Sequence, residues 1–381
     1  MKEFSFSTRV FFGEGSLDRL YKVHDKRVMI VTDAFMEKSG VAHRVAAYLK
    51  DCEVTIFSDV VPDPPIEVVA AGVECFQQCM PEVMIAVGGG SVIDAAKAIR
   101  VVAGRIVGDI DAQVKECFAI PTTSGTGSEV TEYAVVTDAA QGLKYPLASR
   151  ELRPVTAILD PELVVSAPPK VTADSGMDVL THALEAYVST GANDFSDALA
   201  EKAISLVIKW LPIAFENGQD LLAREKMHNA SCMAGLAFNS AGLGVCHGIA
   251  HGIGGKLHIP HGRANAIVLP YVMRFNADLD HGRGSGYCVA AKKYQRLAKI
   301  LDLPCSSVPV GVSQVLKTVE KLNKQLKIPS TLKKGGYDMA LFKKEQENII
   351  EAALADVTTA SNPRQPSYAD IEQLLKQIGG R

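Results

Sequence analysis

Short apolar runs rich in β-branched residues alternate with helical stretches over the first 150 residues. The runs are residues 27–33, 53–57, 83–87 and 118–123. Parallel strands need a long crossover connection, usually a helix, so this alternation predicts an open parallel sheet with helices on both faces. In such a Rossmann-like α/β fold, ligands bind beyond the carboxyl ends of the strands.

The second half of the chain has a different pattern. Prolines 161, 168 and 169 interrupt helical continuation and predict a linker. The predicted helices downstream are 174–189, 196–215, 221–241, 245–254, 289–301, 312–326 and 339–355, and Ser367 with Asp370 predicts a capping box that begins a last helix. Because 381 residues exceed the usual size of one core, we predict an α/β domain over residues 1–165 and an all-α domain over 166–381.

Composition favours small-molecule chemistry. The formal net charge of -3 gives no basic footprint for nucleic acid, and no apolar run approaches the ~20 residues of a membrane helix. The start lacks the features of a signal peptide, and the eight cysteines form no CxxC pair. We expect a soluble, cytoplasmic protein with reduced thiols. Cys246 adjoins His247 and is read either as a core residue or as an oxidation-sensitive thiol.

Metal-ligand residues recur at helical spacing. Asp178 and His182 are four residues apart, as are His247 and His251, and His261 follows. Residues four apart share one helix face, so each pair can direct two polar groups to one point. A single histidine on an apolar helix is commonly a core residue, but six of the nine histidines lie between residues 182 and 261. This concentration predicts a divalent metal site of imidazole and carboxylate.

A glycine run follows the third strand. Gly88, Gly89 and Gly90 allow a bulky ligand to approach the backbone, and the next helix offers its free N–H groups to a pyrophosphate, although an ordinary tight turn is the alternative. Asp33 ends the first predicted strand, where a carboxylate can bind an adenosine ribose and repel a 2'-phosphate. The pattern therefore favours NAD over NADP.

A hydroxyl-rich loop follows the fourth strand. Thr122, Thr123 and Thr126 alternate with glycines in IPTTSGTGSEVT. A plain surface loop would also be polar, but donors at a strand's carboxyl end suit phosphate and ribose contacts. Two such loops together with a metal domain predict a cleft between domains.

These motifs, in this order, resemble the iron-containing alcohol dehydrogenases. The matching segments cover essentially the whole chain: GGGSVIDAAK (88–97), IPTTSGTGSE (120–129), GMDVLTHALEAY (176–187), the HxxxH of 247–251, PHG (260–262) and NPR (362–364). The resemblance implies a dehydroquinate synthase-like architecture. Within the family, the sequence most resembles the propanol dehydrogenases of propanediol-degrading bacterial microcompartments.

The resemblance also implies roles for individual residues. It implies that Asp178, His182, His247 and His261 hold Fe(II), or in some members Zn(II), and that His251 stays uncoordinated as a catalytic proton relay. It places Phe238 in the substrate pocket wall. It assigns cofactor contacts to Asp33, Asp63, Gly88, Gly89, Gly90, Ser91, Asp94, Thr122, Thr123, Thr126 and Lys144. Many members have proline where Gly252 stands, which puts the local backbone and pocket width in question.

We therefore predict an NAD-dependent, Fe(II)-dependent dehydrogenase that interconverts short primary alcohols and aldehydes, with propanol and propanal favoured. The alternatives are a glycerol or polyol dehydrogenase, a lactaldehyde reductase, a metal-dependent cyclising lyase, and a non-catalytic nucleotide or metal sensor. A homodimer or larger homo-oligomer is expected. A microcompartment shell and an aldehyde dehydrogenase are the partners that the resemblance implies.

Overall fold

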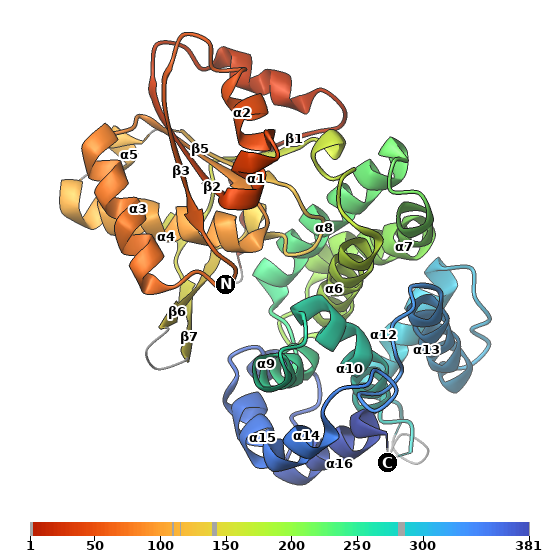
Figure 1. The fold of residues 1–381 in the computed structure, drawn as a ribbon. Coiled ribbons are helices and arrows are strands. Elements are labelled where there is room, and N and C mark those ends of the chain that lie inside the picture. Colours follow the sequence, from red (N-terminus) through yellow and green to blue (C-terminus); the bar gives the residue numbers. More distant parts are fainter. Residues whose placement is uncertain (1–2, 109, 115, 139–142, 281–285, 381) are drawn as a thin grey trace. The chain divides into compact units, whose positions relative to one another are not determined.

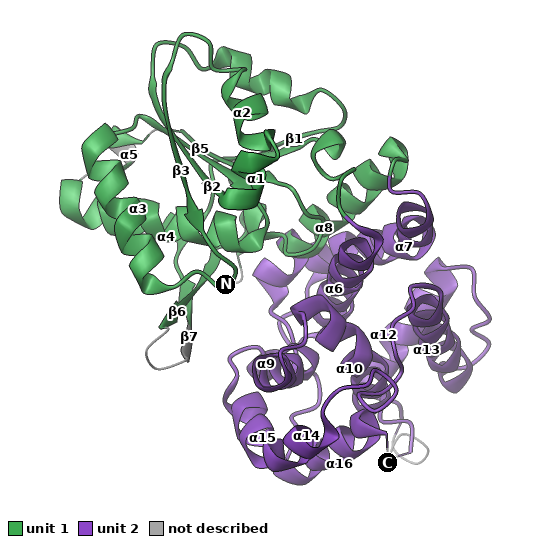
Figure 2. Ribbon diagram, in the orientation of Figure 1, with its two compact units in different colours: residues 1–167, 219–235 green, residues 168–218, 236–381 purple. Residues whose placement is uncertain are grey.

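The structure is a computed structural model that describes residues 3–108, 110–114, 116–138, 143–280 and 286–380. The chain divides into two compact units (Figure 2): unit 1 is Met1–Ala167 with Gln219–Gly235, and unit 2 is Pro168–Gly218 with Leu236–Arg381. Helix α8 (Leu221–Ala241) contributes residues to both. The predicted division into residues 1–165 and 166–381 stays a prediction, since compactness alone does not show which parts fold independently.

Unit 1 contains a six-stranded parallel sheet (Figure 1), which confirms the predicted fold class. The four predicted strands correspond to β2 (Arg27–Asp33), β3 (Glu53–Val60), β4 (Val83–Gly88) and β5 (Glu116–Pro121). The short strands β1 (Arg9–Phe12) and β8 (Thr156–Leu159) complete the order β1-β8-β5-β4-β2-β3. All pairings in this sheet are parallel.

Helices cover both faces of this sheet, as the alternation predicted. The elements on them are η1 (Ser16–Lys22), α1 (Ala34–Lys38), α2 (Val41–Ala46), α3 (Ile66–Cys79), α4 (Gly90–Val107) and α5 (Ile110–Gln113). Successive side chains of a strand point to opposite faces. Met84 and Ala86 of β4 accordingly pack with α3 and α4, whereas Val83 and Ile85 pack with η1 and α2.

A two-stranded hairpin of β6 (Tyr133–Asp138) and β7 (Leu143–Ala148) was not predicted. Pro146 lies within β7 and pairs with Val135. Proline cannot donate to a sheet ladder, so it argues against a central strand. Here β7 has β6 as its sheet neighbour, and the edge position tolerates the proline.

Unit 2 is helical, as predicted. Its helices are α6 (Pro169–Val188), α7 (Asp194–Glu216), α9 (Val245–Leu257), α10 (His261–Ala277), α12 (Val289–Ile300), α13 (Val308–Gln325), α14 (Met339–Lys344), α15 (Gln346–Ala355) and α16 (Tyr368–Gly379). The capping box of Ser367 and Asp370 is confirmed. Two expectations were wrong: Pro169 begins α6 at a position where its missing N–H costs nothing, and the helix predicted over 339–355 is two helices.

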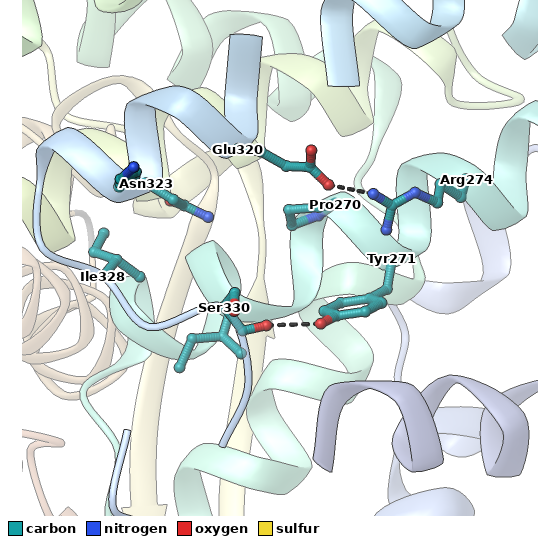
Figure 3. Close-up of a pocket in the computed structure, with 9 residues that line it drawn as sticks. Pro270, Tyr271, Arg274, Glu320, Asn323, Ile328 and Ser330 are labelled. Carbon is teal, nitrogen blue, oxygen red and sulfur yellow. Dashed lines mark hydrogen bonds and ion pairs between the residues drawn. The ribbon is translucent and has the colours of Figure 1, made fainter. Parts of the chain in front are cut away.

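Helix α10 was not predicted, and Pro270 in its interior explains why. A proline lacks the N–H that would bond to the carbonyl four residues earlier, here that of Ala266. Asn323 of α13 donates its Nδ2 to this carbonyl oxygen at 2.7 Å. Pro270 and Asn323 both line a cavity of about 420 Å³ between α10 and α13, and Figure 3 shows the two residues. A tertiary hydrogen bond thus replaces the one that the sequence removes.

Among the described residues, no single helix is long and apolar enough to cross a membrane; by length and composition alone, only the bent pair α8 and α9 meets that test.

Candidate active site

Four predicted metal ligands converge in unit 2. Asp178 and His182 lie one turn apart on the buried helix α6, His247 lies in the first turn of α9, and His261 is the first residue of α10. One ligand atom from each lies within 4.8 Å of the others. Three imidazoles and one carboxylate at a common point are a donor set that suits Fe(II) or Zn(II). The residues therefore fit a divalent ion.

Sequence reasoning missed Glu185, which orients His247. The Oε2 atom of Glu185 lies 2.5 Å from Nδ1 of His247, and its Oε1 accepts a bond of 2.7 Å from the backbone N–H of Cys246. With Nδ1–H donating to Glu185, the lone pair is on Nε2, the nitrogen on the side of Asp178. Burial raises the pKa of Glu185 to about 8 and lowers that of His247 well below its usual value. Glu185 follows Asp178 by seven residues, a helical spacing that could have revealed it.

We expect Glu185→Gln to weaken metal binding by roughly 10- to 100-fold, because the amide is a poorer acceptor for the imidazole N–H. Competition of Zn²⁺ with a chromophoric chelator measures this. Glu201→Gln is the matched control. Glu201, on α7, accepts a hydrogen bond from Tyr187 of α6 and is not among the four ligand groups. Equal affinities in the two variants would contradict the role of Glu185.

His251 lies beside these four residues but is not part of the converging group. Its Nδ1 lies 2.7 Å from Oδ2 of Asp356, and its ring stacks on that of His261 with centroids 5.2 Å apart. Burial raises the pKa of Asp356, but bonds from His251 and Thr358 outweigh this and lower it to about 2. The imidazole is 44% exposed, so a held ring with access to solvent suits proton exchange.

Two further predicted features are placed beside the metal ligands. The ring of Phe238 lies 4.6 Å from that of His182, centroid to centroid. Cys246 is fully buried, its Sγ lies 3.6 Å from the carbonyl oxygen of Asn265, and burial raises its thiol pKa well above the usual value. A buried, protonated thiol is poorly reactive, which favours the packing interpretation over the oxidation-sensitive one.

Gly252 faces α15. A Cβ at this position would lie 3.1 Å from Cγ2 of Ile349 and 3.3 Å from its carbonyl oxygen. The departure from proline therefore concerns the close packing of α9 on α15.

In unit 1, the predicted cofactor residues gather at the carboxyl ends of neighbouring strands. Asp33 ends β2, Gly88 ends β4, and the hydroxyl-rich loop follows β5. A Cβ on Gly89 would lie 3.5 Å from Oγ1 of Thr123, and a Cβ on Gly90 would lie 2.6 Å from Cγ2 of Thr126. The contact at Gly89 is an ordinary one, but a side chain at Gly90 would clash, so Gly90 allows the two loops to meet at the start of α4. The free N–H groups there attract a pyrophosphate.

The remaining cofactor candidates have mixed positions. The backbone N–H of Asp63 donates to Oγ of Ser91 at 3.3 Å. Asp33 also caps α1, since its Oδ1 accepts bonds from Phe35 and Met36 N–H groups at 2.9 and 2.8 Å. Thr122 is buried at the end of β5. Lys144 lies in β7, but its side chain is outside the described part of the structure.

Asp94 is engaged within unit 1. Its Oδ1 accepts a bond of 2.5 Å from Ser128 Oγ, and its Oδ2 accepts one of 3.0 Å from Val135 N–H. The buried Lys97 one turn later donates to Ser128, Thr131 and the Tyr133 carbonyl. Sequence reasoning missed this lysine. Together the two charged residues fasten the hydroxyl-rich loop to α4.

His228 also anchors this loop and was missed. Its Nδ1 lies 3.0 Å from Oγ of Ser124, and burial lowers its pKa from 6.5 to about 4. Between these values the unfolded chain binds a proton that the folded chain does not. Stability is therefore lost as the pH falls from 6.5 to 4, by about 3 kcal/mol at most.

We expect His228→Gln to flatten this acid dependence, so that its melting temperature falls less than that of the wild type between these pH values. Thermal unfolding followed by circular dichroism at a series of pH values tests this. His43→Gln, at an exposed histidine of α2, should keep the wild-type slope. An identical slope in all three proteins would exclude His228 as the source.

A sheet with a phosphate-compatible edge and a separate cluster of three imidazoles and a carboxylate define the class of nicotinamide- and metal-dependent oxidoreductases. Residues 7–161 match the family described as iron-containing alcohol dehydrogenase, and residues 172–379 match the C-terminal part of the Fe-containing alcohol dehydrogenase family. The chain belongs to the iron-containing alcohol dehydrogenases. The predicted family and enzyme class are confirmed. The predicted cofactors, iron and NAD, agree with the family's description and with a similar structure that contains NAD+.

Three similar proteins illustrate the range of this family. The 1-propanol dehydrogenase PduQ of Citrobacter freundii is 46% identical, over 99% of this chain and 100% of its own. An NADPH-dependent butanol dehydrogenase of Clostridium saccharobutylicum is 39% identical, over 99% and 98%. The structure of sulfoacetaldehyde reductase from Bifidobacterium kashiwanohense in complex with NAD+ matches with a TM-score of 0.86 and 29% identity, over 100% and 99%.

Proposed function

We propose that this enzyme interconverts short primary alcohols and aldehydes, with 1-propanol and propanal as the best substrates. The observation that carries the proposal is the convergence of Asp178, His182, His247 and His261 to within 4.8 Å. Identity of 46% to a 1-propanol dehydrogenase over the full chain supports the substrate.

The four converging residues would hold the iron. The ion they hold would supply Lewis acidity, which polarises the oxygen of an alcohol or an aldehyde. Glu185 fixes the tautomer of His247. The burial of Asp178, His182 and His247 strengthens the electrostatic interactions among them.

His251 would exchange the proton of the alcohol with solvent, held in place by Asp356. Phe238, whose ring lies beside that of His182, would form the apolar wall that a short alkyl chain contacts. These two residues separate the roles of proton transfer and substrate fit.

The cofactor would lie at the carboxyl edge of the sheet in unit 1. Its pyrophosphate would meet the glycines 88–90 and Ser91 at the start of α4, with Asp63, Thr122, Thr123, Thr126 and Lys144 as further contacts. Asp33 would bind the adenosine ribose and favour NAD over NADP. Asp94 would support cofactor binding indirectly, because it holds the hydroxyl-rich loop against α4.

The test is oxidation of NADH by propanal, measured at 340 nm with anaerobically added Fe(II) and with a chelator. We expect turnover with Fe(II) and little with the chelator, and a preference for NADH over NADPH. Lactaldehyde and longer aldehydes serve as comparison substrates with NADH, and glycerol is compared with 1-propanol in the reverse direction, with NAD+. No NADH consumed with any aldehyde and none formed from either alcohol would refute the dehydrogenase and leave the sensor and the cyclising lyase. Faster oxidation of glycerol than of 1-propanol would favour the polyol dehydrogenase.

The surroundings of the enzyme are also proposed from its relatives. We place it in the cytoplasm as a homo-oligomer, inside a microcompartment that degrades propanediol, with an aldehyde dehydrogenase as neighbour. Co-sedimentation with purified shells tests encapsulation, and its absence from the shell fraction in cells that make shells would refute it.

A further inference from the structure

Asn265, a residue of α10, contacts several of the proposed ligand atoms. It lies four residues after His261, on the same face of the helix, and is fully buried. Its Nδ2 lies 2.7 Å from Oδ1 of Asp178, 3.1 Å from Nε2 of His261 and 3.2 Å from Nε2 of His247. A single amide group therefore faces three of the four proposed ligand atoms.

The chemistry of these contacts is complementary. An amide NH₂ offers two donors, whereas a carboxylate oxygen and an unprotonated Nε2 are acceptors. Oδ1 of Asp178 lies 3.4 Å from Nε2 of His261 and 3.9 Å from Nε2 of His247, so the acceptors are close together. Asp178 and His247 are buried, and acceptors at such distances repel one another unless a donor or a cation faces them. Asn265 supplies a donor.

The surroundings of the amide oxygen of Asn265 also indicate that its NH₂ group faces the ligand atoms. Sγ of Cys246 lies 3.9 Å from Oδ1 of Asn265 and 3.6 Å from its carbonyl oxygen, so the weak thiol donor faces the amide oxygen. The reversed amide would place its oxygen against the carboxylate of Asp178. The hydrogen-bonding groups thus select the orientation with the NH₂ toward the ligand atoms.

We propose that Asn265 is a positioning residue for the metal centre, holding Asp178, His247 and His261 on one point before the ion arrives. This inference rests on the proposed ligand set. The bond to Asp178 is compatible with coordination, because a carboxylate has about four lone-pair sites. The two imidazoles would use their Nε2 lone pairs to bind the ion, in place of the contacts with Asn265. Asn265 thereby lowers the cost of assembling the site.

A merely structural role is the competing explanation. A buried asparagine on α10 can also stabilise the helix packing, and its loss would then weaken the metal site indirectly. Asn323 offers a matched control: it is also buried and also bonds to α10, through the carbonyl of Ala266, but it contacts none of the ligand atoms. Both Asn265→Leu and Asn323→Leu remove an amide of similar shape.

The experiment measures Zn²⁺ affinity by chelator competition and the melting temperature of the metal-free protein for each variant. We expect Asn265→Leu to bind Zn²⁺ roughly 10- to 100-fold more weakly, as for other groups that orient metal ligands. Asn323→Leu should lower the melting temperature while its Zn²⁺ affinity stays within about threefold of the wild type. Asn265→Ser, which keeps a polar group that is too short to reach Asp178, should follow Asn265→Leu and serves if the leucine variant fails to fold.

Equal or tighter Zn²⁺ binding by the Asn265 variants would overturn the inference, as would the same loss in Asn323→Leu. Failure of the proposed metal centre gives a different result, because the wild-type protein itself would then not bind one Zn²⁺ in this assay.

Discussion

His261→Ala is expected to lose its metal and to reduce kcat/KM for propanal by roughly a thousandfold, about 4 kcal/mol of transition-state stabilisation. His261 is the first residue of α10, and its Nε2 lies 3.4 Å from Oδ1 of Asp178. Removing one imidazole leaves three ligands and opens the site to water. Metal content after dialysis and steady-state kinetics at added Fe(II) measure the two effects.

The binding of NADH should be largely unaffected by the loss of the metal. The glycine and hydroxyl loops belong to unit 1, whereas His261 belongs to unit 2, so the Kd for NADH should change little. His258→Asn is the matched control: it removes an exposed imidazole three residues away, at a position of φ 53° that asparagine tolerates. Retained metal and turnover in His261→Ala would mean that a different set of residues binds the ion.

Gly127→Ala is expected to destabilise unit 1 by about 3 kcal/mol or more and to weaken NADH binding. A Cβ at Gly127 would lie 2.6 Å from Cα of Gly235, a backbone atom that cannot rotate away, and the φ of 66° is strained for alanine. The clash would displace the hydroxyl-rich loop from the segment of α8 in unit 1. Thermal unfolding and fluorescence titration with NADH measure the two effects.

Gly15→Ala isolates the backbone contribution. Gly15 has a φ of 75° but no atom within 4 Å of a built Cβ, so alanine there should cost only the conformational strain, about 1 kcal/mol. If Gly127→Ala were no more destabilising than Gly15→Ala, the close approach of Gly127 to Gly235 would not be a constraint in solution.

Elements with a clear local pattern of apolar residues could be predicted from the sequence. β2 and β4 are continuous apolar runs because both of their faces are buried, and α8 shows one uninterrupted helical pattern. Helix α10 escaped prediction because Pro270 breaks the local rule, and the hydrogen bond from Asn323 that compensates comes from a helix 53 residues later. Local sequence contains no signal of that partner.

Some residues of the candidate site could likewise be predicted from the sequence, and others could not. Residue type and helical spacing selected Asp178, His182, His247, His251 and His261 as candidate ligands. The resemblance to the family then implied the four ligands and set His251 apart. Glu185, Asn265 and His228 were missed because their roles depend on which side chain lies opposite them.

The sequence by itself determined the parallel sheet, the helical second half and the set of groups able to hold iron and a dinucleotide, because strand alternation, helical spacing and donor chemistry are local properties. Only the tertiary structure decided which of those groups meet. Hydrogen bonds and burial join residues far apart in the chain, and these contacts set the tautomer of His247, the position of Asp94 and the protonation of Cys246.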